Sequence, residues 1–305
     1  MKPTLPTRAS LLALAALLCT ALTAAPAAAQ DSAALAALLA RVSPSIVTVR
    51  IVTTTTYKSG GQEQNSESRM ELQGVVVTPQ GLVMLSYLPF NSVRMKQLMG
   101  AFGGGGDSSF GITIKPTKFK VVFENDLNEY EAYLAATDQK LDLAFIQVEG
   151  LNGKALTPVQ FTGGGTPAIG DRVYSIGRLT KGYDYAPFFQ NARVCGQINK
   201  PRPAWLVDGS VTEMGLPVYN SAGSVVGVLT DINAASGADS GDSGADFMSM
   251  ARMFGGGAGM QSFLVPSSGV NGVIALATTQ AADLAAKRAA AAKATPAAPA
   301  KPKPF

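Results

Sequence analysis

Short runs of β-branched and aromatic residues dominate the chain from Ser45 onward. They are five to nine residues long and are separated by Gly, Pro, Asn and Asp, the residues typical of turns. Twelve such runs occupy residues 45–53, 73–78, 81–86, 119–124, 131–138, 143–149, 171–177, 192–198, 204–210, 216–220, 225–232 and 262–266. No helical periodicity separates them. The pattern therefore predicts an all-β, antiparallel sandwich or barrel rather than an α/β fold.

The first 29 residues have the pattern of a secretory signal peptide. Lys2 and Arg8 precede an apolar run from Leu11 to Leu22, and small residues continue to Ala29, near which we expect cleavage. The apolar run is shorter than the roughly 20 residues that a spanning helix needs, and no later segment reaches that length. The sequence thus predicts export to the periplasm or the extracellular space, with no transmembrane segment.

Alanine-rich segments flank the strand-like body. Residues 30–44 predict an N-terminal helix that Pro44 ends, residues 45–280 form the body, and residues 281–305 predict an Ala/Lys/Pro-rich helix and disordered tail. Two insertions, residues 94–110 and 246–260, each combine a Met-rich stretch with a glycine run. We expect them to form mobile surface loops or, alternatively, an adaptable rim that binds a partner.

Charge and cysteine content exclude several classes of protein. The formal net charge is +4, and removing the two leader cations and the five cations of the last 19 residues leaves −3 for the body. A basic face for nucleic acid is therefore not expected. Cys195 is the only cysteine after the leader, so no internal disulfide is expected, and we predict that its side chain is buried. Trp205 is predicted to lie in the core.

Several segments, in this order, resemble the protease domain of the HtrA/DegP group of trypsin-like serine proteases. They are RVSPSIVTV at 41, GVVVTPQGLVMLSYLPF at 74, AATDQKLDLAFIQVEG at 135, AIGDRVYSIGR at 168, GSVVGVLTDI at 223 and GMQSFLVPSSGVNGVI at 259. The resemblance implies two six-stranded antiparallel β-barrels, with short N-terminal and C-terminal helices and a catalytic triad at the junction of the barrels. It also implies that the chain can form an oligomer, a trimer by analogy with the family. The PDZ modules of the family are not recognisable.

Carried over position by position, the resemblance retains only the aspartate of the triad, Asp142. Leu88 stands where the family has histidine, and Met214 where it has the nucleophilic serine. The former oxyanion loop comprises Thr212, Glu213, Met214, Gly215 and Leu216. Asp142, having lost its imidazole partner, is expected to bond to backbone or water, or alternatively to meet a cation of a ligand.

The chain contains no histidine at all, so no register of the motifs can supply an imidazole base. Lys140 is expected on an exposed turn, whereas a lysine that acts as the base in place of histidine needs burial. The run GADSGDSGAD at 237 lacks the alternation of a calcium loop, and with one mature cysteine there are no zinc ligands. No cofactor or metal is expected.

Three functions remain open on this basis. The first is a catalytically inactive pseudoprotease that binds an extended peptide or protein, since a barrel junction without a nucleophile can still accept a strand. Leu88, Met214 and Leu216 would make that junction apolar. The second is an active serine endopeptidase with a non-standard site, and the third is a structural subunit of an envelope complex. The sequence predicts no nucleic-acid partner for any of them.

Overall fold

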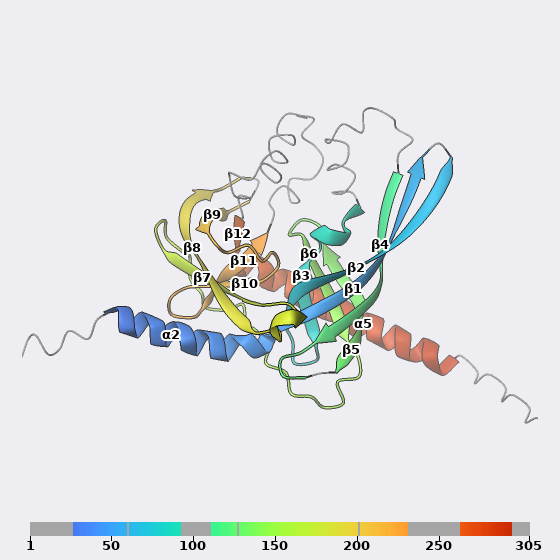
Figure 1. Ribbon diagram of the computed structural model, residues 1–305, viewed down its shortest axis with the longest axis horizontal. Helices are drawn as coiled ribbons and strands as arrows, with labels where there is room; N and C mark the ends of the chain where they lie inside the picture. The colour runs from blue at the N-terminus through green and yellow to red at the C-terminus, as the bar shows by residue number, and fades with distance from the viewer. Residues whose placement is uncertain are drawn as a thin grey trace, which may run out of the picture.

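The computed structural model describes residues 27–59, 61–92, 111–126, 128–200, 202–230 and 263–294. Two closed six-stranded antiparallel barrels lie side by side (Figure 1). The first has the strand order β1-β2-β3-β6-β5-β4 and comprises β1 (Ile46–Ser59), β2 (Gln62–Val76), β3 (Leu82–Ser86), β4 (Gly111–Val122), β5 (Glu129–Asp138) and β6 (Leu143–Val148). A 3₁₀ turn, η2 (Leu88–Phe90), follows β3.

The second barrel has the order β10-β11-β12-β9-β8-β7. Its strands are β7 (Arg172–Arg178), β8 (Pro187–Ile198), β9 (Ala204–Gly209), β10 (Pro217–Tyr219), β11 (Val225–Thr230) and β12 (Phe263–Pro266), with a 3₁₀ turn η3 (Lys181–Tyr183) between β7 and β8. The predicted all-β class and the two barrels are confirmed. All twelve apolar runs of the sequence fall on these strands.

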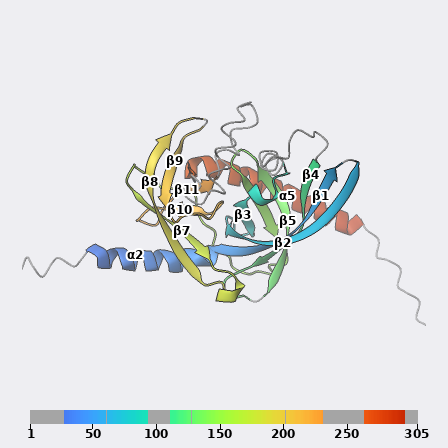
Figure 2. The ribbon, with the colours of Figure 1, turned by 45° about the horizontal axis from the view of Figure 1, so that its top comes forward.

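Helices precede and follow the barrels. α2 (Ala27–Val42) continues into the 3₁₀ turn η1 (Ser43–Ser45), which leads directly into β1. α5 (Ser267–Ala294) follows β12 and passes behind both barrels (Figures 1 and 2). It has 28 residues, far longer than the short C-terminal helix expected, because the helix after Pro266 and the alanine-rich helix predicted from Ala281 are one continuous element.

Three hydrophobic clusters form the core. Each barrel has its own interior cluster, represented by Val83 and Leu85 in the first barrel and by Val194 and Leu264 in the second. The third cluster lies between the barrels and under the helices, and it includes Met84. Successive side chains of β3 therefore face opposite apolar environments. This explains why its sequence, LVMLS, is apolar without alternation.

A buried arginine joins the two barrels and the N-terminal turn. The guanidinium of Arg178, at the end of β7, donates to the carbonyl oxygens of Ile46 (2.8 Å), Ser43 (2.6 Å) and Tyr185 (2.9 Å). It also lies 3.0 Å from a carboxylate oxygen of Glu124. Because every one of these donors has an acceptor, burial of the charge is compensated. The relative position of the barrels is thus fixed by polar as well as apolar contacts.

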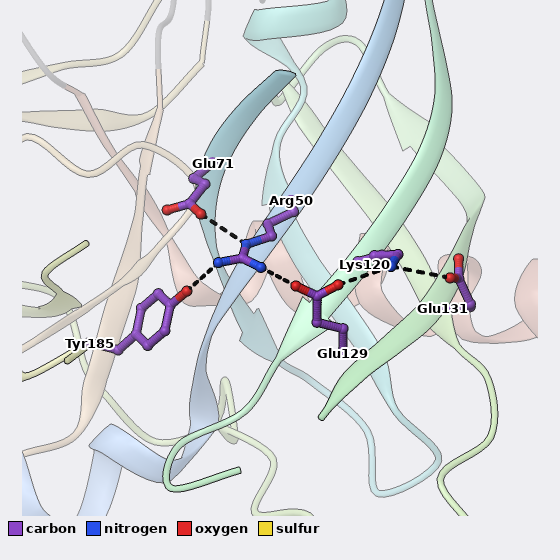
Figure 3. Close-up of polar contacts among 6 residues, drawn as sticks. All are labelled: Arg50, Glu71, Lys120, Glu129, Glu131 and Tyr185. Carbon is purple, nitrogen blue, oxygen red and sulfur yellow. Dashed lines mark hydrogen bonds and ion pairs between the residues drawn. The ribbon is translucent and has the colours of Figure 1, made fainter. Parts of the chain in front are cut away.

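A second arginine links the barrels at the surface. Arg50 on β1 donates to Glu71 (2.9 Å) and Glu129 of the first barrel, and to the Tyr185 hydroxyl (2.6 Å), which belongs to the β7–β8 connection (Figure 3). Lys120 continues the row of charges, lying 2.9 Å from Glu129. The Lys120 hydrogen bond lowers the pKa of the Glu129 carboxyl. Alternating charges therefore follow one outer face of the first barrel.

β1, β2 and β4 extend well beyond the first barrel as a three-stranded wing (Figures 1 and 2). The register of β1 and β2 is continuous from Ile46 opposite Val75 to Ser59 opposite Gln62. The apolar pattern predicted only residues 45–53 and 73–78 of this hairpin, because the outer part is almost entirely polar. Cross-strand pairing, not burial, makes these residues strands.

Two side chains of the second barrel test predictions of burial. Trp205 on β9 is buried, as predicted. Cys195 on β8 was predicted to be buried but is exposed. On this strand Ala192 and Val194 face the barrel interior, so the period-2 alternation turns Cys195 outward. The sequence run was apolar enough to suggest burial but did not fix which face of the strand each residue occupies.

Candidate functional site

The retained aspartate is paired with a serine. Asp142 lies immediately before β6, its side chain is buried, and its backbone has a φ of 54°. The Ser86 hydroxyl, at the end of β3, donates to Oδ2 of Asp142 at 3.0 Å. The same hydroxyl accepts the backbone N–H of Leu88 at 3.3 Å. Asp142, which was expected to bond to backbone or water, is therefore stabilised by a side chain of the same barrel.

Leu88, which stands where the family has histidine, lies two residues after Ser86 in the chain. Leu88 begins η2 and is half-buried, with a side chain that cannot carry a proton. The preceding residue, Tyr87, donates its backbone N–H to the Asp142 carbonyl at 2.9 Å. Burial and the charge of Asp142 raise the pKa of the Tyr87 hydroxyl. The segment that should carry the base is thus held against Asp142 but supplies only hydrogen-bond donors.

The former nucleophile loop packs directly on the end of β3. Gly215 has a φ of 81° and donates its N–H to the Leu229 carbonyl at 2.9 Å. A Cβ at Gly215 would lie 2.4 Å from the backbone nitrogen of Ser86, so only glycine fits there. The structure therefore brings together the segments that contain Asp142, Leu88 and Met214.

The apolar replacements in this loop differ in what they can contact. Met214 is half-buried and packs against the interior cluster of the second barrel. Leu216 is fully buried in the cluster between the barrels. Leu216 therefore contributes to the apolar packing between the barrels but offers no exposed surface to a ligand. Only Leu88 and Met214 retain exposed surface.

A glutamine engages the amide that an active protease would need free. Serine proteases stabilise the oxyanion with the backbone N–H of the nucleophile and that of the residue two positions before it. By the motif correspondence of the resemblance, the equivalent residues of this chain would be Met214 and Thr212. The Thr212 N–H donates to Oε1 of Gln190 at 3.3 Å, and Nε2 of Gln190 donates back to the Thr212 hydroxyl at 3.4 Å. One of the two oxyanion donors is thus already paired.

Glu213 places an acid between these two positions. Its side chain is half-buried, and desolvation raises the pKa of its carboxyl above the ordinary value. Among the described residues no hydrogen bond or ion pair to this carboxyl is found. An acid at this point opposes the build-up of negative charge that acyl transfer requires. It also offers an attachment point for a cation.

The other candidates do not assemble into a site. Lys140 is exposed, as predicted for its turn. Over the described ranges, no three His, Cys, Asp or Glu side chains gather closely enough to hold a metal ion. None of the helices in the same ranges combines the length and apolarity needed to cross a membrane. The insertions at 94–110 and 246–260 and the acidic run at 237 lie outside the described residues.

Sequence reasoning missed Ser86 and Gln190. Ser86 could have been found, because it lies two residues before the histidine position and can donate to the carboxylate nearby. Gln190 had no signal, since it is 22 residues from Thr212 and lies on a different strand. Its role depends entirely on how β8 packs beside the loop.

Comparison with known proteins gives the same fold. Residues 73–228 match the family described as trypsin-like peptidase domain. A solved structure titled "Crystal structure of Deg5" is similar, with a TM-score of 0.45 and 20% sequence identity, covering 66% of this chain and 86% of that chain. No curated protein matches the chain in sequence. Since the family match extends over half of the chain, from β2 to β11, the protein belongs to the family of trypsin-like peptidase domains.

Proposed function

We propose that this protein is an exported pseudoprotease, a trypsin-like domain that binds an extended peptide or protein segment without cleaving it. The observation that carries the proposal is the absence of histidine from the chain. A serine hydroxyl needs a base to become a nucleophile, and loss of the base or nucleophile lowers turnover by about 10⁶ in a serine protease where it was measured.

Two features of the junction support this proposal independently of the residue count. The Ser86 hydroxyl donates to Oδ2 of Asp142, so the carboxylate has a hydrogen-bond partner within its own barrel without an imidazole. Gln190 engages the Thr212 N–H, so one of the two backbone donors that an oxyanion hole would use already has a partner. In this proposal the chain lacks the base and the nucleophile, and one oxyanion donor already has a partner. The trypsin-like fold nevertheless persists.

The proposed ligand is an extended segment at the junction of the barrels. Leu88 and Met214 supply partly exposed apolar side chains there, and Glu213 supplies a half-buried carboxyl that would favour a basic side chain in the ligand. The insertions at 94–110 and 246–260 would extend this surface. Export to the periplasm or extracellular space rests on the leader-like pattern of residues 1–29.

The experiment uses homogeneous mature protein with unfolded casein and a fluorophosphonate probe. We expect neither cleavage nor labelling, while retention on immobilised casein persists. Cleavage or labelling that disappears on changing a single serine to alanine would establish an active endopeptidase and overturn the proposal. N-terminal sequencing of the protein recovered from the expressing cells tests export, with Gln30 expected as the first residue.

Deletion variants separate a binding module from a structural subunit. Versions lacking 94–110 or 246–260 should lose casein retention if these insertions extend the binding surface. A Glu213→Gln variant should weaken retention of Lys/Arg-rich peptides more than that of neutral peptides. If the wild type retains no peptide at all but co-purifies in a stoichiometric envelope assembly, the structural alternative is correct.

A further inference from the structure

The outer half of β2 has an unpaired edge. Residues 62–69 are all exposed and pair with β1 on one side, whereas β3 pairs with β2 only at residues 74–76. Among the described residues, no strand lies along the other side. The edge contains no proline, and its register with β1 is continuous, without a bulge. Such an edge presents a row of free N–H and C=O groups that another strand can bond.

The hairpin geometry shows which residues present these groups. Ser59 pairs with Gln62 across a two-residue connection, and such a closing pair exchanges both backbone hydrogen bonds. Bonded and non-bonded pairs then alternate, so even-numbered residues of β2 bond to β1. Val77, an odd-numbered residue, donates to Leu82 on the β3 side, in agreement with this alternation. The free groups of the wing therefore belong to residues 63, 65, 67 and 69.

The side chains of these four residues are self-complementary. A second copy of β2 related by a two-fold axis at Ser66 would place Glu63 opposite Arg69, and Asn65 opposite Glu67. Directly opposite side chains share a face of the sheet, where unlike charges attract and an amide can donate to a carboxylate. A two-fold axis at Asn65 or Glu67 would instead oppose glutamates. Charges that normally protect an edge thus favour the register centred on Ser66 over those centred on Asn65 or Glu67.

From this edge we infer that the protein forms a two-fold dimer through antiparallel pairing of β2 with β2 of a second copy, centred on Ser66. The two three-stranded wings would become one six-stranded sheet. Glu63, which lies 3.2 Å from Lys58, would then have cations on both sides. The dimer uses no residue of the junction between the barrels, so its test is independent of the proposed peptide binding.

A two-fold axis at Ser68 is the rival register, and it would set Glu67 opposite Arg69. That register extends the pairing to Gln73, whose side chain already accepts the Arg178 N–H at 2.6 Å beside the second barrel. Substitutions at Glu67 distinguish the two. Glu67→Gln is nearly neutral with the axis at Ser66, because position 67 faces Asn65, but it removes an ion pair with the axis at Ser68.

The test is sedimentation velocity of the full mature chain over a concentration series. We expect a reversible dimer whose Kd increases by about tenfold in Glu63→Arg and in Arg69→Glu, because two symmetric ion pairs become repulsive in each. The combined variant Glu63→Arg/Arg69→Glu should return to within about threefold of the wild-type Kd. Glu131→Arg, an exposed charge change on β5 away from this edge, is the control.

A proline at position 67 tests the backbone bonds. Because the Glu67 N–H faces away from β1, Glu67→Pro removes an edge donor without breaking the hairpin ladder. We expect it to abolish the dimer, whereas Glu67→Gln preserves it. A wild type that stays monomeric throughout the concentration series would overturn the inference. So would a dimer that survives Glu67→Pro, or a double variant Glu63→Arg/Arg69→Glu that dimerises no better than the two single variants.

Discussion

The Ser86 hydroxyl lies 3.0 Å from Oδ2 of Asp142, and this hydrogen bond joins the last residue of β3 to the residue that precedes β6. Both side chains are buried. In a triad the aspartate accepts a hydrogen bond from imidazole, which orients the base. Here a hydroxyl of the same barrel provides a donor instead. The buried carboxylate is thereby stabilised by the hydroxyl of Ser86, and the chain has no imidazole to take that place.

Removing this hydroxyl should cost stability. We expect Ser86→Ala to lower the free energy of unfolding by about 1–3 kcal/mol, because the buried carboxylate loses a donor. In Asp142→Asn the charge is absent, so the same serine change should cost less. Urea denaturation of the two single variants and the double variant measures the coupling, and strictly additive losses would contradict a direct bond.

Restoring the triad residues should not be sufficient for activity. We expect Leu88→His/Met214→Ser to cleave casein poorly, because Gln190 still holds the Thr212 N–H. Adding Gln190→Ala should increase the rate by at least tenfold, given that one oxyanion donor contributes about 10²–10³ to kcat. Initial rates with a fluorogenic peptide provide the measurement. Equal rates with and without Gln190 would show that the amide is not the obstacle.

Glu213 should make the free energy of unfolding fall as the pH rises. Desolvation raises its pKa above the unfolded value of 4.5, so the folded state favours the protonated form. The stability associated with the protonated carboxyl is present at acidic pH and is lost as the pH rises through the folded pKa. Glu213→Gln should therefore gain stability relative to wild type between pH 4 and pH 7, as measured by thermal unfolding. The exposed Glu67→Gln variant is the control.

Asp126 should make the free energy of unfolding fall as the pH decreases, which is the opposite of the effect of Glu213. Hydrogen bonds from the Lys154 ammonium (2.6 Å), the Asn128 backbone and the Tyr130 hydroxyl (2.8 Å) lower the pKa of its carboxyl far below the ordinary 3.8. The stability it contributes is present above the unfolded pKa and is lost as the pH falls through the folded pKa. Asp126→Asn should thus flatten the loss of stability below pH 4.

Lys154→Met serves as the partner variant for this prediction. The Lys154 ammonium is the main cause of the lowered pKa and also lies 5.4 Å from the Phe123 ring centroid and 5.7 Å from that of Tyr130. Its loss should reproduce the flatter acid profile. A profile as steep as that of the wild type in both variants would show that other carboxylates govern acid unfolding.

The sequence by itself determined the class of fold and the absence of an imidazole side chain. Short runs of β-branched and aromatic residues bounded by turn residues predict twelve strands whatever their pairing, because residue preference and turn position are local properties of the chain. The absence of histidine excludes an imidazole base in any fold. Motif order predicts that Asp142, Leu88 and Met214 lie in one region, and in the structure Gly215 packs against Ser86.

Only the tertiary structure decided which face each residue occupies and which distant groups meet. Cys195 and Leu216 have similar apolar surroundings in the sequence, yet one is exposed and the other fully buried, because strand register and barrel closure set their direction. Likewise, the hydrogen bonds of Ser86 to Asp142 and of Gln190 to Thr212 join segments that are far apart in the sequence. The local residue pattern does not show that these segments meet. The polar wing of β1 and β2 follows from cross-strand pairing, which leaves no apolar signal in the sequence.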